Sequence, residues 1–303
     1  MRVSLIVDVE DVAGYREGLP ALLKLFSEYQ IQATFLFSLG YDNSGLHVKN
    51  FFNPSVLSRQ LPLVQKCYGT LLPPASLSKK FKTLIKNCAA DGHDVGIKSF
   101  DSATWQSHAL TADREWTKRS LQWSVESFVD LLGRQPEIHS ASGFVINAHL
   151  LQLEQELGFK LGLDTRGKTA YFPEYQSVGS QTMQLPVTLP SIEELLLSDG
   201  IDLDNVHEYL FVESQQQLPH GQVYQVRAAY EGRAWLDVLE KILVMWRSTQ
   251  WEFNRVTEVI DGISADELLT HQVGWAQYRP HKRYMATQSL PVDSSDKKKI
   301  SEA

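Results

Sequence analysis

The first forty residues constrain the fold more than any other stretch of the sequence. Residues 3–7 form a short apolar and β-branched run, which is typical of a buried strand. The stretch Pro20–Tyr29 carries apolar side chains at helical spacing, and Gln32–Leu39 forms a second strand-like run. A strand, a helix and a strand in this order favour a βαβ unit, and therefore a parallel sheet.

Three carboxylates follow the first predicted strand directly: Asp8, Glu10 and Asp11. Open α/β sheets and α/β barrels place their chemistry at the carboxyl ends of their strands. We therefore take these acids as candidate site residues. The alternative is that they only solvate a loop and cap the helix that starts near Pro20.

The alternation of strands and helices continues along the chain. Further strands are predicted at residues 94–97, 137–142, 161–163, 184–187, 223–229 and 251–255, with helices between most of them. This pattern predicts an α/β fold, best explained by a distorted (β/α) barrel; an open doubly wound sheet is the alternative. No GxGxxG or GxxxxGK[ST] loop follows a strand, which weakens a nucleotide-binding interpretation.

Length and charge narrow the class of protein. A chain of 303 residues is long enough for one large domain, which we place at residues 1–285, followed by a disordered tail at 286–303. The net charge of -7 argues against nucleic-acid binding. Two cysteines without a CxxC motif, no secretory signal and no membrane-spanning run predict a cytoplasmic protein.

An insertion is predicted at about residues 51–77. It is rich in Leu, Pro and aromatic residues, with Lys and Arg scattered through it. Such a composition suits a segment that covers a site or rests on a membrane surface. The alternative is a helical excursion that packs on the barrel.

Several motifs together resemble the polysaccharide deacetylase (NodB-homology) family. The stretch LIVDVEDVAGYREGLPALLKLFSEYQIQATFLFSLGYDNSGLH begins the likeness, and VGIKSFDSATWQ, LDTRG, QLPVTLP and VYQVRAAYEG continue it over roughly residues 3–270. The sequence is most similar to the 4-deoxy-4-formamido-L-arabinose-phosphoundecaprenol deformylase branch. This resemblance implies a distorted (β/α)7 barrel that uses a divalent metal, zinc or a relative, to hydrolyse an N-acyl group on a sugar. In this branch the group is formyl, and the sugar is linked to a polyprenyl phosphate at the cytoplasmic face of the inner membrane, in lipopolysaccharide modification.

Such hydrolysis needs a metal held by one carboxylate and two imidazoles, a carboxylate base and an imidazole acid. By the resemblance, Asp8 takes the position of the base and Glu10 that of the metal-binding carboxylate. The two metal-binding histidines are replaced by Lys98 and Ser102, and the histidine acid is replaced by Arg227. Lysine is a cation at neutral pH, serine is a poor metal ligand, and arginine does not release its proton. We therefore expect no metal and a catalytically degenerate protein that binds a sugar-phosphate polyprenyl lipid or a partner enzyme, with a peripheral membrane contact left open.

Lys98 is expected to supply the charge that a metal would have supplied. Its ammonium would lie among Asp8, Glu10 and, as a further option, Asp101, because buried carboxylates without a cation are costly. The alternative is that Lys98 points to solvent.

Other candidate residues come from the same resemblance. Ligand contacts are expected at Asn43, Asp164, Thr165, Arg166 and Thr188. Arg166 would pair with a phosphate, or else form a structural salt bridge. The arginine that orients the base in the family falls near Val145.

A second hypothesis keeps the protein an enzyme. It would remove formyl or acetyl from an amino sugar by hydrolysing the amide bond, with a rearranged, zinc-like metal site. That site would use Asp8, Glu10 and one of the histidines nearest the motifs, namely His93, His108 and His139.

Overall fold

The computed structural model describes residues 1–47, 62–278 and 284–292. Residues 51–61 of the predicted insertion and 293–303 of the predicted tail therefore lie outside the described part of the chain. No helix in the described part is both long and apolar enough to cross a membrane.

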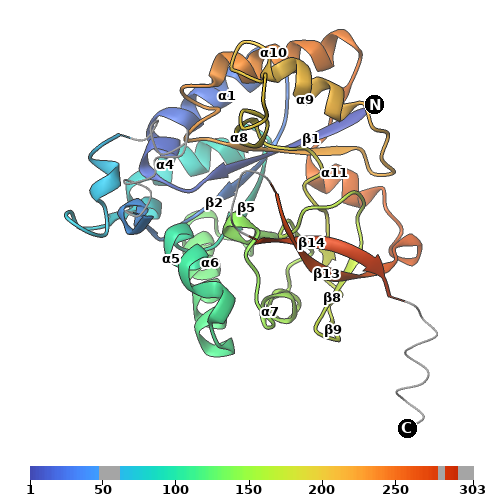
Figure 1. Ribbon diagram of the computed structural model, residues 1–303. Helices are drawn as coiled ribbons and strands as arrows, with labels where there is room; N and C mark the ends of the chain where they lie inside the picture. The colour runs from blue at the N-terminus through green and yellow to red at the C-terminus, as the bar shows by residue number, and fades with distance from the viewer. Residues whose placement is uncertain (48–61, 279–283, 293–303) are drawn as a thin grey trace.

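A curled parallel sheet forms the centre of the molecule (Figure 1). Its strands run in the order β10-β7-β6-β5-β2-β1-β11, with all neighbours parallel, and β12 (Glu252–Phe253) pairs with the start of β1. The seven strands are β1 (Arg2–Val9), β2 (Thr34–Phe37), β5 (Asp94–Lys98), β6 (Ile138–Ser140), β7 (Leu161–Gly162), β10 (Met183–Gln184) and β11 (Gln222–Arg227). Backbone amides of Thr188 and Leu189 donate to the Val223 carbonyl and join the two ends of the sheet. The predicted distorted (β/α)7 barrel is confirmed.

Helices cover the outside of this barrel, and their apolar faces form the main core with the outward side chains of the strands. They are α1 (Leu19–Glu28), α4 (Leu77–Ala90), α5 (Ser102–His108), α6 (Arg114–Leu132), α7 (Leu150–Glu156), α8 (Ile192–Leu195), α9 (Val206–Ser214), α10 (Leu236–Ser248) and α11 (Val256–Asp261). Helix α1, for example, buries Leu22, Leu25 and Phe26 in the core that β1 and β2 share. Short helical turns lie at Gly14–Gly18, Ser44–His47, Gln65–Cys67, Ala109–Thr111, Ser142–Phe144 and Ala265–Glu267.

A second sheet lies beside the barrel, with β13 and β14 crossing its lower side in Figure 1. Its order is β14 (Tyr284–Pro291), β13 (Thr270–Gln277), β8 (Phe172–Tyr175) and β9 (Val178–Gly179). The prediction of a disordered tail from residue 286 is therefore wrong for residues 286–291. Ala286 is fully buried, and its carbonyl accepts a hydrogen bond from the Arg166 amide. A small ribbon pairs β3 (Tyr41–Asp42) with β4 (Ala75–Ser76).

Candidate functional site

Strand alternation directs the acids of β1 toward the barrel interior. Val7 and Val9 belong to the core shared with the helices, whereas Ile6 belongs to the inner apolar cluster. Because side chains alternate along a strand, Asp8 points inward with Ile6, and Glu10 follows on the same side. Asp8 is only 4% exposed, so its carboxylate needs partners inside the barrel.

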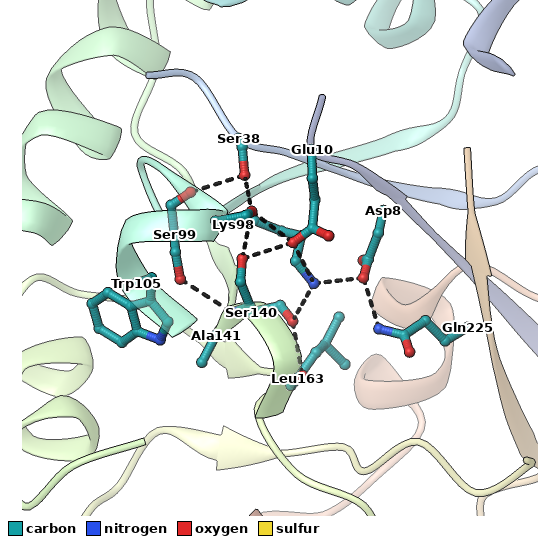
Figure 2. Close-up of polar contacts among 12 residues, drawn as sticks. Asp8, Glu10, Ser38, Lys98, Ser99, Trp105, Ser140, Ala141, Leu163 and Gln225 are labelled. Atoms are coloured by element: carbon teal, nitrogen blue, oxygen red, sulfur yellow. Dashed lines mark hydrogen bonds and ion pairs between the residues drawn. The ribbon is translucent and has the colours of Figure 1, made fainter. Parts of the chain in front are cut away.

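Lys98, the last residue of β5, supplies the main partner (Figure 2). Its Nζ lies 2.6 Å from Asp8 Oδ2 and 3.6 Å from Glu10 Oε1, and the side chain is 1% exposed. The predicted position of the ammonium between the two acids is confirmed, and the solvent-facing alternative is wrong. Asp101 does not join the group, because its carboxylate accepts from the Thr104 amide at the start of α5 and from Asn43.

Serine hydroxyls fill the space on the other side of Glu10. Oε1 of Glu10 accepts hydrogen bonds from Ser102 and Ser142, both at 2.7 Å. The two hydroxyls lie 2.8 Å apart, and Ser38 Oγ lies 2.9 Å from Ser102 Oγ. Ser102 thus acts as a hydrogen-bond donor to the carboxylate. Sequence reasoning missed Ser142, since nothing near it in the sequence marks it.

Gln225 is a second residue that sequence reasoning missed. Its Nε2 donates to Asp8 Oδ2 at 2.7 Å (Figure 2). Gln225 stands two residues before Arg227 on β11, so strand periodicity places both side chains on the inner face. That two-residue spacing was an available signal.

The charges of the cluster follow from burial and pairing. Burial raises the pKa of Asp8 to about 6, although Lys98 opposes this. Burial also acts on Glu10, but Lys98 and the two serine hydroxyls outweigh it and lower its pKa. For Lys98, burial disfavours the charge, yet Asp8 and Glu10 raise its pKa above the usual value. At neutral pH the cluster therefore holds an ammonium between two carboxylates.

Arg227 lies opposite Asp8 in the register of β1 and β11. Its Nη1 donates to Glu193 at 3.3 Å, and its guanidinium lies 5.2 Å from the centre of the Tyr230 ring. Its Nε and Nη2 are buried and have no hydrogen-bond partner in the part of the chain that the structure describes. Burial opposes the charge of Arg227, but Glu231 and Glu193 raise its pKa far above neutrality. Arg227 therefore stays a cation.

The donor set does not fit a divalent metal. A protonated amine has no lone pair to offer, and the Lys98 ammonium already lies between the two carboxylates. Ser102 adds only a neutral hydroxyl that donates to Glu10.

His139 lies in a separate buried group with Glu154 and Asp164. Among the described residues this is the only set of three or more His, Cys, Asp or Glu side chains whose metal-binding atoms lie within 4.8 Å of one another. His139 Nδ1 lies 2.5 Å from Glu154 Oε1 and 3.4 Å from Asp164 Oδ1. Gln184 and the Ala141 amide donate to Asp164 at 2.7 and 2.6 Å. Because these oxygens already accept hydrogen bonds, we interpret the group as a polar brace between β6, α7 and β10.

The three histidines of the second hypothesis do not come together. His93 Nδ1 accepts from the Ala33 amide before β2, at the amino end of the barrel. His108 ends α5 and contacts the Thr104 carbonyl. His139 is the only one of the three in the group above.

Most of the residues expected to contact a ligand lie in the barrel wall, where they bind other protein groups. Asn43 is at the rim, bonded to Asp101. Arg166 is 5% exposed and pairs with Glu194 at 2.9 Å. Of the two alternatives for Arg166, pairing with a phosphate or a structural salt bridge, the structure has the salt bridge. The others are similarly engaged: Asp164 in the brace, Thr165 with Tyr171, and Thr188 with Gln222. Val145 is buried, and its carbonyl accepts from Trp105.

Known proteins share this sequence and architecture. Residues 3–162 match the family model described as Polysaccharide deacetylase. A Shewanella sediminis (strain HAW-EB3) protein, named probable 4-deoxy-4-formamido-L-arabinose-phosphoundecaprenol deformylase ArnD, is 26% identical over 295 residues, which cover 92% of this chain and 94% of that protein. A structure from Mycobacterium smegmatis, described as a polysaccharide deacetylase, superposes with a TM-score of 0.62 at 14% identity, over 92% of this chain and 94% of the other.

A second similar structure is a mutant of a CE4 family pseudoenzyme from Bacillus anthracis, described as having restored enzymatic activity. It superposes with a TM-score of 0.53 at 10% identity, over 86% of this chain and 67% of the other. At this identity the likeness concerns the fold alone.

Proposed function

The chain belongs to the polysaccharide deacetylase family and is related to the ArnD deformylases, and we propose that it is a member that has lost catalysis. In this proposal it binds a sugar-phosphate polyprenyl lipid of the kind named in its relatives, at the cytoplasmic face of the membrane, without hydrolysing it. The observation that carries the proposal is the Lys98 ammonium, 2.6 Å from Asp8 where the family's metal chemistry would be expected.

Amide hydrolysis needs an electrophilic group for the carbonyl oxygen, a base for water and an acid for the departing amine. Asp8 is held by Lys98 and Gln225, which both donate to its Oδ2, while its Oδ1 is buried and accepts no hydrogen bond from the described residues. By the resemblance, Arg227 takes the position of the family's acid, and its guanidinium keeps its proton. In this proposal the described residues supply a carboxylate at the base position. They supply neither an electrophilic group for the carbonyl oxygen nor an acid for the departing amine.

The same residues suit binding of an anionic group. Nε–H and Nη2–H lie on one edge of a guanidinium and can donate to two oxygens of one phosphate. In Arg227 both atoms are buried and have no hydrogen-bond partner among the described residues, while 19% of the side chain as a whole is exposed. Asn43 at the rim would meet sugar hydroxyls. A partner enzyme that presents or receives this lipid fits the same proposal.

Restoring the imidazoles tests the loss of catalysis. We expect the double variant Lys98→His, Ser102→His to retain zinc after dialysis against a zinc-containing buffer. Two neutral imidazoles and the Glu10 carboxylate would then be available as metal ligands. The matched control Lys98→Ala, Ser102→Ala removes the ammonium but adds no ligand, and it should stay metal-free. If the double-histidine variant also stays metal-free, the assignment of these two positions is wrong.

The second hypothesis, that the protein is an active hydrolase, is tested with the unaltered protein. We expect no formate from a short-chain formamido-arabinose polyprenyl phosphate with added zinc, and no stoichiometric metal after purification without chelator. Formate release together with one zinc per chain would overturn the proposal in favour of an active hydrolase, provided that the Glu10→Ala variant no longer holds the zinc.

A further inference from the structure

Basic residues are concentrated in one segment of an acidic protein. Residues 62–90 contain five lysines and no Asp or Glu, whereas the whole chain has a net charge of -7. The segment therefore carries a local charge opposite to that of the rest of the molecule. Such segregation suits contact with an anionic surface.

The lysines of this segment face outward on α4. Lys79, Lys80, Lys82 and Lys86 are all exposed, while the opposite side of the helix buries Leu77, Phe81, Ile85 and Cys88 against the barrel. None of the four pairs with an acid at salt-bridge distance in the described part of the chain. Their charge is thus available to a partner.

Large apolar side chains are exposed in the stretch of chain that leads into α4. Leu63 is 75% exposed, Val64 59%, Leu71 84% and Leu72 40%. They belong to the light-blue projection at the left edge of the molecule, beside α4 (Figure 1). We call these four residues and the four α4 lysines the basic-apolar face. Exposed apolar side chains among lysines are typical of segments that lie in a membrane interface.

The basic-apolar face adjoins the mouth of the site. The Ala13 amide after β1 donates to Gln65 Oε1 at 3.0 Å, between the exposed Val64 and the rest of the projection. The Gly45 amide donates to the Tyr68 carbonyl, and the Leu77 amide donates to Gly40 at the end of β2. The projection is therefore tied to the loops that follow β1 and β2, where Asp8 and Glu10 emerge.

We propose that the basic-apolar face docks the protein on a bilayer of anionic phospholipid. The lysines contact the phosphate headgroups, and Leu63, Val64, Leu71 and Leu72 enter the boundary between headgroups and acyl chains. The inference rests on the proposed function only in one respect: a lipid-linked ligand would then lie in the same bilayer as the docked site. An acidic protein and a second copy of this chain are the other occupants that the test must distinguish.

Vesicle co-sedimentation tests the docking without any sugar ligand. We expect the full chain to bind vesicles of phosphatidylglycerol and phosphatidylethanolamine, to bind pure phosphatidylcholine vesicles far less, and to be partly released by high salt. Replacing Lys79, Lys80, Lys82 and Lys86 by Ser should weaken partitioning about six hundredfold, since each lysine near an anionic surface contributes roughly fivefold.

The matched control replaces four exposed lysines elsewhere, Lys24, Lys160, Lys168 and Lys241, and so changes the net charge equally. It should bind like the unaltered chain. Leu63→Ser with Leu71→Ser should remove the binding that persists at high salt. Thermal unfolding of each variant verifies that it is folded.

Three results would overturn the docking proposal: no binding to anionic vesicles, equal loss in both lysine variants, or self-association that Leu71→Ser abolishes. Binding of a water-soluble formamido-sugar phosphate by the α4 variant is measured in parallel. If the unaltered chain and the α4 variant bind this sugar phosphate but the unaltered chain binds no anionic vesicles, only the docking proposal fails; if no chain binds the sugar phosphate while the unaltered chain binds vesicles, only the proposed function fails.

Discussion

At the scale of single residues, Lys98 holds the site together. Its ammonium sits in a region that is nearly inaccessible to water, so the attraction to Asp8 is little screened. Removing one partner of a buried ion pair is far more costly than removing both, because an unpaired charge remains. The cluster should therefore tolerate the loss of the pair better than the loss of Lys98 alone.

We predict that Lys98→Met lowers the free energy of unfolding by about 3–5 kcal/mol, measured by urea denaturation at pH 7. The double variant Asp8→Asn, Lys98→Met should recover much of this loss. Lys160→Met, at an exposed lysine, serves as control and should change stability by less than about 0.5 kcal/mol. A Lys98→Met protein as stable as the unaltered chain would contradict the assignment of a structural ion pair.

The residue scale also shows what the sequence can reveal of the site. The motif positions predict that Lys98, Ser102 and Arg227 take the places of the family's histidines, and the contact of Lys98 with both acids followed from charge alone. Ser142 could not be assigned in this way, because polar residues in loops are common and only the folded barrel brings it to Glu10. The spacing of Gln225 from Arg227 could place it on the inner face of β11, but its contact with Asp8 depends on the pairing of β11 with β1.

At the scale of elements, the polar brace couples β6, α7 and β10. Hydrogen bonds of Asp164 and Glu154 raise the pKa of His139 to about 9 against the effect of burial, and burial raises the pKa of Glu154 to about 8. Both groups hold protons more tightly in the folded state than in the unfolded state. Their contribution to stability is therefore largest at low pH and falls as pH rises through 8 and 9.

We predict that the free energy of unfolding falls on the order of 3 kcal/mol between pH 6 and pH 9, as measured by urea denaturation across that range. Glu154→Gln should flatten the decline, since the proton that Glu154 would lose is no longer present. Glu156→Gln, at an exposed glutamate two residues away, should leave the slope unchanged. Parallel curves for all three proteins would show that the brace does not titrate in this range.

At the scale of the whole molecule, the barrel could be predicted and the second sheet could not. The barrel strands are apolar runs with helices between them, so local periodicity identifies them. Strands β13 and β14 contain Thr, Gln, Ser and His, and they are stabilised by pairing with each other and with β8, about a hundred residues earlier in the chain. Non-local pairing of this kind leaves little trace in local composition.

This pairing makes β14 part of the folded unit, although its sequence resembles a tail. The Gln288 amide donates to the Arg166 carbonyl at 2.7 Å, and Met285 and Ala286 are buried. We predict that a chain ending at residue 283 is less stable by about 3 kcal/mol or more than one ending at residue 292, because it loses these bonds and this burial. Urea unfolding of the two chains measures the difference. Equal stability would mean that the strand from residue 284 contributes nothing to the fold, and that the boundary predicted at residue 285 was physically correct.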